Sequence, residues 1–132
     1  MAVIRIPCVG GVVKDLEGRL LLIKRGHEPG AGLWSLPGGR TELGESDATA
    51  LVREMLEETG LTVTPGPLAG AVERPGRNGT ILEIRDYYAT VTGGTLKAGD
   101  DAADARWVDP AELDDLPLTP GLLEALTEWA VV

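Results

Sequence analysis

Three glutamates within five positions carry the strongest chemical signal in this sequence. Glu54, Glu57 and Glu58 lie in residues 39–61, which read GRTELGESDATALVREMLEETGL. With a helical step of about 100° per residue, Glu57 and Glu58 fall at about 300° and about 40° from Glu54, so the three carboxylates share one face. Like charges on one face repel each other, and a divalent cation would remove that penalty. Oxygen ligands of this kind suit Mg²⁺ or Mn²⁺.

The same segment has the pattern of an amphipathic helix. Apolar residues recur at helical spacing on the side away from the glutamates: Ala48, Leu51, Val52 and Met55. Ser46 is a suitable N-cap, and Gly60 stands where a left-handed glycine ends a helix. Just before the helix, Pro37 followed by Gly38 and Gly39 predicts a tight turn.

Several strands and a second helix are expected to position this central helix. Strands are predicted at 3–14, 20–25, 61–71 and 80–91, with a short one at 106–108. The first two are joined by a turn and predict a hairpin, and Gly10 and Gly11 predict a bulge or a close backbone approach in the first. A helical turn at 111–113 and an amphipathic helix at about 120–130 follow. This order favours an α/β sandwich, with two layers of helix around a sheet.

Composition narrows the class of protein. The 132 residues predict one domain over 1–132, with 43% hydrophobic and 25% charged residues. No apolar run approaches the roughly 20 residues that cross a membrane, so a cytoplasmic protein without a membrane partner is expected. The net charge of −9 argues against a nucleic acid polymer as partner. It is compatible with a small phosphorylated ligand, because bound metal makes an acidic site locally positive.

The spacing within residues 39–61 resembles the signature of the Nudix hydrolase family. That signature is Gly, five residues, Glu, seven residues, Arg-Glu, an aliphatic, any residue, Glu-Glu, any residue, Gly and an aliphatic. The matching residues are Gly39, Glu45, Arg53, Glu54, Met55, Glu57, Glu58, Gly60 and Leu61. A pattern with so many fixed residues is specific. The resemblance implies a Nudix-type α/β/α sandwich with a mixed β-sheet.

The resemblance also implies a reaction and a set of metal ligands. Members of the family hydrolyse a nucleoside diphosphate linked to another group, with Mg²⁺ or Mn²⁺. By resemblance, the ligands are the side chains of Glu54, Glu58 and Glu57 and the backbone carbonyl of Gly38. Glu45 is expected to reach back toward the same metals. Arg53, four residues before Glu57, is expected to pair with it and orient it.

The general base and the substrate contacts lie partly outside the motif. The loop GDDAADARW offers Asp101 as the best match to the base of related enzymes and Asp100 as the next, with Glu57 as the other choice. Arg25 stands where relatives place an arginine on the substrate phosphates, and Gly39 is expected beside the substrate. Trp34 is interpreted either as packing under the glycine loop or as stacking on a base.

The substrate is less well specified than the reaction. Pro75 lies 15 residues after Gly60, close to a proline carried by ADP-ribose pyrophosphatases. ADP-ribose or a related nucleotide sugar is therefore the first hypothesis, and a nucleoside triphosphate such as 8-oxo-dGTP is the second. A sensor of nucleotides without catalysis is a rival, which the intact motif disfavours. Many relatives are dimers, so a homodimer stays open.

Overall fold

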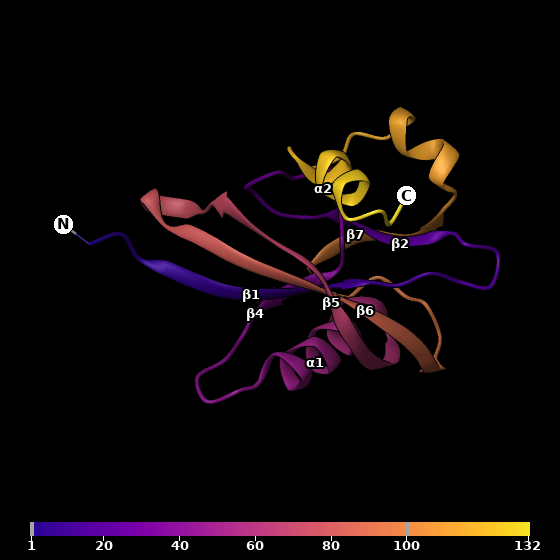
Figure 1. Ribbon diagram of the computed structural model, residues 1–132, viewed down its shortest axis with the longest axis horizontal. Helices are drawn as coiled ribbons and strands as arrows, with labels where there is room; N and C mark the ends of the chain where they lie inside the picture. Colours follow the sequence, from indigo (N-terminus) through magenta and orange to yellow (C-terminus); the bar gives the residue numbers. More distant parts are fainter. Residues whose placement is uncertain (1, 100) are drawn as a thin grey trace.

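The chain forms two β-sheets with a helix packed on either side (Figure 1). The computed structural model describes residues 2–99 and 101–132. One sheet has the strand order β4-β1-β6-β5, with β4 at Gly38–Arg40, β1 at Arg5–Val12, β6 at Ile81–Gly94 and β5 at Leu61–Pro75. The other has the order β3-β2-β7, with β3 at Trp34–Ser35, β2 at Leu20–Arg25 and β7 at Ala102–Val108. The helices are α1, Asp47–Thr59, and α2, Leu122–Glu128, with short 3₁₀ turns at Arg77–Gly79 (η1) and Pro110–Asp115 (η2).

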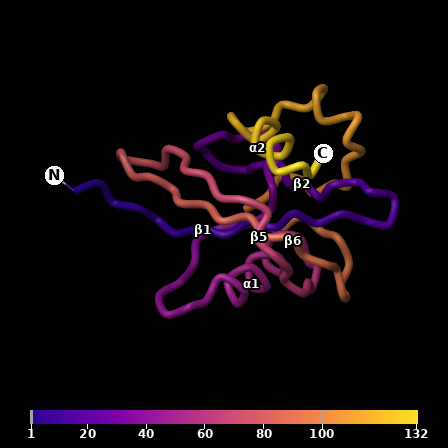
Figure 2. Tube along the Cα trace, in the orientation of Figure 1, coloured from indigo at the N-terminus to yellow at the C-terminus, as the bar shows by residue number. Residues whose placement is uncertain are grey.

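The larger sheet is mixed, as predicted. Strand β1 pairs with β6 in parallel, whereas β1–β4 and β5–β6 are antiparallel. Figure 2 shows β1 running beside the long hairpin formed by β5 and β6. The expected hairpin of the first two strands is wrong. Those strands pair only next to their turn, at Lys14 and Leu20, and then separate into different sheets because β1 finds its partner in β6.

Hydrophobic side chains cover both faces of the larger sheet. Successive strand residues point to opposite faces, so β1 contributes to two cores. Val9 packs with Leu51 and Met55 of α1 in one cluster, and Val12 packs with Leu126 of α2 in the other. All of these side chains are buried. The sheet therefore fixes α1 relative to the strands that precede and follow it.

The ends of α1 are held as its sequence predicts. The Ser46 hydroxyl accepts a hydrogen bond from the Thr49 N–H at 3.2 Å, and Gly60 ends the helix with φ of 74°. The start of the helix is also tied to β6. Asp47 accepts hydrogen bonds from Arg85 at 2.5 and 2.7 Å and from the Tyr87 hydroxyl at 2.5 Å. These contacts join residues about 40 positions apart and fix the orientation of α1.

Helix α2 is shorter than predicted, and η2 matches the expected helical turn. Gly121, with φ of 84°, precedes the first residue of α2, so the helix begins two residues after Pro120. In the described part of the chain, no helix is both long and apolar enough to cross a membrane.

Replacing Asp47 with Ala tests the tie between α1 and β6. Losing three hydrogen bonds to a carboxylate and a favourable helix-dipole charge should cost about 2 kcal/mol of unfolding free energy, measured in urea. The hydrogen bond from Arg85 lowers the pKa of Asp47, so this contribution is present at neutral pH and is lost as the pH falls through the lowered pKa. Asp114→Ala, at an exposed position, should cost much less. Equal losses would contradict the tie.

Candidate active site

A cavity of about 350 Å³ is lined by Glu54, Glu57, Glu58 and Asp101. Three of these come from one face of α1, and the fourth comes from the loop before β7. The loop is held there because the Gly99 N–H donates to the Glu58 backbone carbonyl at 2.9 Å. The structure thus brings together the four side chains that the sequence predicts as metal ligands and base. Asp100, the second candidate base, lies outside the described residues.

Glu58 is the most buried carboxylate of the cavity. Its Oε1 accepts a hydrogen bond from the Gly38 N–H at 3.0 Å. Burial raises the pKa of Glu58 to about 7, with the neighbouring charge of Glu54 adding to the rise. Arg25 acts in the opposite direction, but Glu58 has no ion-pair partner within the described ranges. The buried charge is therefore incompletely balanced by the protein itself.

Gly39 allows β4 to approach α1. A Cβ atom at this position would collide with the Glu54 carboxylate, 2.5 Å away. Burial raises the pKa of Glu54, and Arg53 Nη1, which donates to Glu54 Oε1 at 2.8 Å, opposes that rise. The glycine that begins the motif thus leaves room for one of its carboxylates.

Arg53 holds Glu45 more closely than it holds Glu57. Its Nε and Nη2 donate to the two oxygens of Glu45 at 2.8 and 2.9 Å, whereas the predicted contact with Glu57 is present at 3.4 Å. The hydrogen bond from Arg53 lowers the pKa of Glu45 to about 2. Arg53 Nη2 also donates to the Arg40 carbonyl at 3.0 Å. Glu45 therefore fixes Arg53 and does not line the cavity.

The remaining predicted contacts lie around this centre. Arg25, at the end of β2, donates from Nε to the Pro29 carbonyl at 2.8 Å. Trp34 is only 5% exposed and belongs to the core beneath α2, with the Arg106 guanidinium 5.4 Å from its ring centre. This placement corresponds to the packing alternative. His27, which is not among the predicted site residues, lies with Nε2 3.6 Å from Asp101 Oδ1.

The chemistry of the cavity fits a hard divalent cation. Its lining side chains offer only carboxylate oxygens, the donors that Mg²⁺ and Mn²⁺ prefer, and two of these carboxylates carry a raised pKa. Over residues 2–99 and 101–132, no three acidic, histidine or cysteine side chains are already arranged closely enough to hold a metal ion. Arg53 still occupies one oxygen of Glu54, so cation binding would require these side chains to shift.

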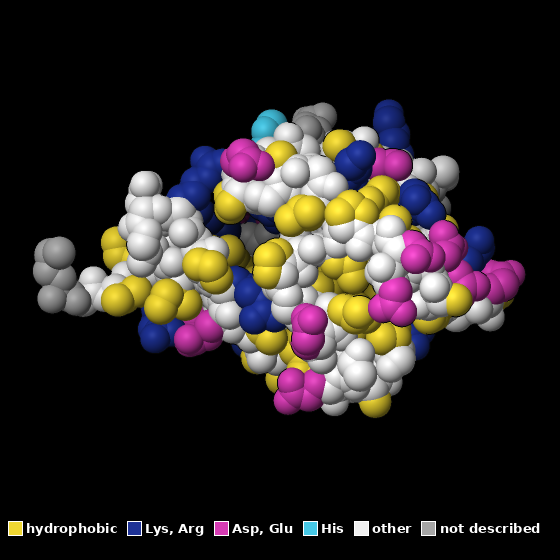
Figure 3. Space-filling view, turned by 90° about the horizontal axis from the view of Figure 1, so that it is seen from above, with side chains coloured by type: hydrophobic (Ala, Val, Ile, Leu, Met, Phe, Trp, Pro, Cys, Tyr) yellow, Lys and Arg dark blue, Asp and Glu magenta, His cyan; other side chains and the backbone are white. Residues whose placement is uncertain are grey.

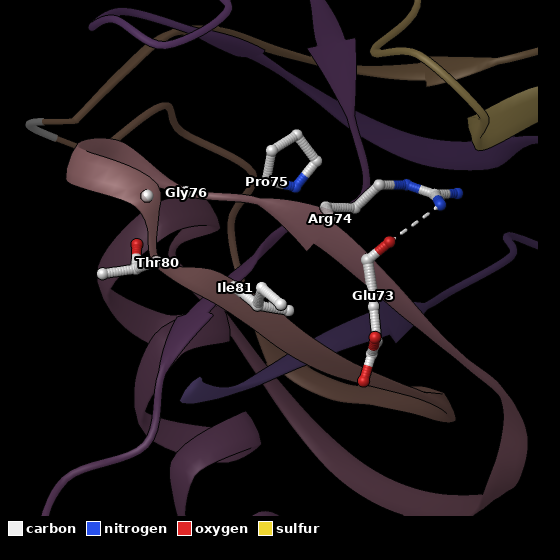
Figure 4. Close-up of a pocket in the computed structure, with 7 residues that line it drawn as sticks. Glu73, Arg74, Pro75, Gly76, Thr80 and Ile81 are labelled. Carbon is white, nitrogen blue, oxygen red and sulfur yellow. Dashed lines mark hydrogen bonds between the residues drawn. The ribbon is translucent and has the colours of Figure 1, made fainter. Parts of the chain in front are cut away.

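A second hollow of about 350 Å³ lies on the β5–β6 hairpin, away from these carboxylates. Figure 4 shows Glu73 and Arg74 leaving β5 in different directions there, with Arg74 Nη1 donating to the Glu73 carbonyl at 3.1 Å. Glu73 also pairs with Arg5. One paired carboxylate does not form a reactive cluster, so the candidate active site is the cavity on α1.

Comparison with known proteins agrees with this geometry. The NUDIX domain model matches residues 4–129. The chain belongs to the NUDIX domain family. The structure of the MutT protein from Methanosarcina mazei Go1 superimposes with a TM-score of 0.86, at 24% identity, over 98% of this chain and 96% of that one. The predicted Nudix-type fold is thereby confirmed.

Two curated relatives have named activities. The ADP-ribose pyrophosphatase of Methanocaldococcus jannaschii is 41% identical over 83% of this NUDIX chain, which spans only 63% of that relative. The CTP pyrophosphohydrolase of Escherichia coli is 35% identical over 91% of this chain and 90% of its own length. Their names differ in the nucleotide that is cleaved.

Gly39→Ala should disturb the site without unfolding the protein. The added methyl group displaces the end of the Glu54 side chain, so the affinity for Mn²⁺ should fall about tenfold or more, while the melting temperature changes little. Calorimetric titration with Mn²⁺ measures the affinity. The matched control is Gly93→Ala, because a Cβ atom there meets nothing closer than 4.0 Å. Unchanged Mn²⁺ affinity in Gly39→Ala would argue against Glu54 as a ligand.

Proposed function

We propose that this protein hydrolyses the diphosphate linkage of a small nucleoside diphosphate derivative, within one domain over 1–132. The observation that carries the proposal is the convergence of Glu54, Glu57, Glu58 and Asp101 on one cavity beside the Gly38–Gly39 turn. Glu54, Glu57, Glu58 and the carbonyl of Gly38 would hold Mg²⁺ or Mn²⁺. When bound, the cation neutralises phosphate charge and stabilises the leaving phosphate.

The chain's own residues supply the other requirements. Asp101 is the proposed general base: its carboxylate faces the cavity from the loop and takes a proton from the attacking water. The water oxygen bonds to one phosphorus while the bridging P–O bond breaks, and two phosphate products result. Glu57 is the alternative base. Arg25 lies close enough to Glu58 to influence its pKa, so it is well placed to bind a phosphate of the substrate.

ADP-ribose or a related nucleotide sugar is the proposed substrate. The M. jannaschii relative, an ADP-ribose pyrophosphatase, supports it through 41% identity. Pro75, which stands close to the position of a proline in ADP-ribose pyrophosphatases, lies at the end of β5 in the wall of the second hollow.

A nucleoside triphosphate is the second candidate. It is favoured by the E. coli CTP pyrophosphohydrolase, because the match covers 90% of that enzyme's length. Both candidates require the same attack on a phosphorus atom and differ only in the group that leaves.

A substrate panel tests the proposal. Purified protein with Mg²⁺ or Mn²⁺ should release phosphate-containing products from at least one of ADP-ribose, UDP-sugars, CTP, 8-oxo-dGTP, NADH and dinucleoside polyphosphates. Glu58→Gln should lower kcat by about a hundredfold or more. Without metal this variant should melt no lower than the parent, because it removes a costly buried charge. Full activity in Glu58→Gln would remove Glu58 from the site.

The loop base is tested by a pair of aspartates. Asp101→Asn should lower kcat about a hundredfold or more, because the amide cannot accept the proton from water. Asp104→Asn is the matched control: the Asp104 side chain accepts from the Ala105 N–H at 2.8 Å, and it is not among the residues that line the cavity. Steady-state rates of the two variants are compared at several pH values. Similar losses would shift the role of base to Glu57.

A further inference from the structure

Four residues that lie side by side on neighbouring strands form a row across the larger sheet, and three of them are glycines. The strand registers align Gly38 of β4 with Gly10 of β1, Gly10 with Asp86 of β6, and Asp86 with Gly70 of β5. Asp86 is therefore the one residue of this row that has a side chain. Its carboxylate lies over Gly10, where a Cβ atom would collide with Asp86 Oδ1.

The Asp86 carboxylate faces the space between the two sheets. Neighbouring residues of a strand point to opposite faces, and a Cβ at Gly11 would meet Met55 of α1. Gly10 and Asp86 therefore face away from α1, toward the side of β2, β7 and α2 (Figure 1). Seen from that side, the surface has a hollow flanked by basic and apolar side chains (Figure 3).

The Asp86 side chain has no protein partner among the described residues. It is 5% exposed, and within the described part of the chain it makes no side-chain hydrogen bond and no ion pair. The cation that influences it, Arg74, donates instead to the carbonyls of Gly121 and Glu73. Among the described residues no side-chain oxygen that is sealed from solvent lacks a partner, so the Asp86 oxygens still reach the surface and can accept a hydrogen bond from a ligand.

The carboxylate has an aromatic neighbour and a connection to the acidic cavity. The indole of Trp129 occupies the space above Gly70, the next residue of the row. At the other end, the N–H of Gly38 donates to Glu58. Gly38 lies two strands from Asp86, which corresponds to about 10 Å. A ligand whose diphosphate lies at Glu58 would pass the edge strand β4 to bring its base to Asp86 and Trp129 on the other face of the sheet.

An ionised carboxylate only accepts hydrogen bonds, which limits the ligand groups it can recognise. Burial raises the pKa of Asp86 to about 6, so the group is mainly ionised at neutral pH. It suits the exocyclic amino group of adenine, cytosine or guanine. Uracil presents a carbonyl at the position where cytosine has its amino group, so a carboxylate placed to accept from that amino group would face another acceptor and be repelled.

We propose that Asp86 is a specificity-determining residue that accepts a hydrogen bond from the exocyclic amino group of the substrate's nucleobase. Trp129 provides an apolar surface beside it. This inference rests on the proposed function for the orientation of the ligand. It leaves open which amino-bearing base is preferred, and it predicts discrimination against uridine and thymidine nucleotides.

Cytidine and uridine nucleotides form the sharpest test, because their bases differ at the amino position. Calorimetric titration in Mg²⁺ should show CMP binding about tenfold or more tightly than UMP. In Asp86→Asn the preference should vanish or reverse, because the amide can donate to the uracil carbonyl while accepting from the ring N–H. Glu83→Gln, on the same strand but on the opposite face, should keep the parent ratio.

Each result decides the inference. Equal binding of CMP and UMP by the parent, no binding of either, or an unchanged ratio in Asp86→Asn would overturn it. The ratio of CMP to UMP affinity is measured on the unmodified protein, so this test remains valid even if Asp86→Asn does not fold. The variant should melt at or above the parent temperature, and a large fall would assign Asp86 a structural role instead. A CMP preference without hydrolysis of any panel compound would refute the proposed function and retain the base site.

Discussion

Crowding of carboxylates on one face of α1 is the constraint on which the rest of the structure depends. Glu54, Glu57 and Glu58 repel each other, and Arg53 offsets only part of that repulsion. The helix persists because contacts outside the acidic face hold it: Leu51 and Met55 are fully buried against the sheet, and Asp47 is tied to β6. Packing and hydrogen bonding to the strands therefore offset the repulsion among these carboxylates.

Local features of the site were predictable because they depend on residues close in sequence. The cap at Ser46, the end at Gly60 and the shared face of the glutamates follow from helix geometry alone. The partner of Arg53 was only partly predicted. Residues four apart on a helix are neighbours, which predicts the contact of Arg53 with Glu57. Glu45 lies before the helix, so its contact with Arg53 depends on the path of the preceding loop.

Features that depend on distant pairing were not predictable. The first two strands alternate and are joined by a turn, which favours a hairpin, yet β1 pairs with β6 about 76 positions later, from Arg5 with Ile81 onward. The same pairing places Gly10 beside Asp86, so a polar residue in an otherwise ordinary strand becomes a buried carboxylate. The sequence suggested a close backbone approach at Gly10 and Gly11, and the structure identifies what approaches: Asp86 on one face and Met55 on the other.

Glu58 and Asp86 are the two carboxylates whose burial raises the pKa most clearly. Asp86 belongs to the strand register, and Glu58 of α1 contacts that register through Gly38. Glu58 receives an N–H from Gly38, whereas Asp86 receives nothing from the described residues, so their requirements differ. A hard cation satisfies the first, and a directional N–H donor satisfies the second. The proposed ligand would meet both requirements by passing the edge strand β4, with its phosphates at Glu58 and its base at Asp86.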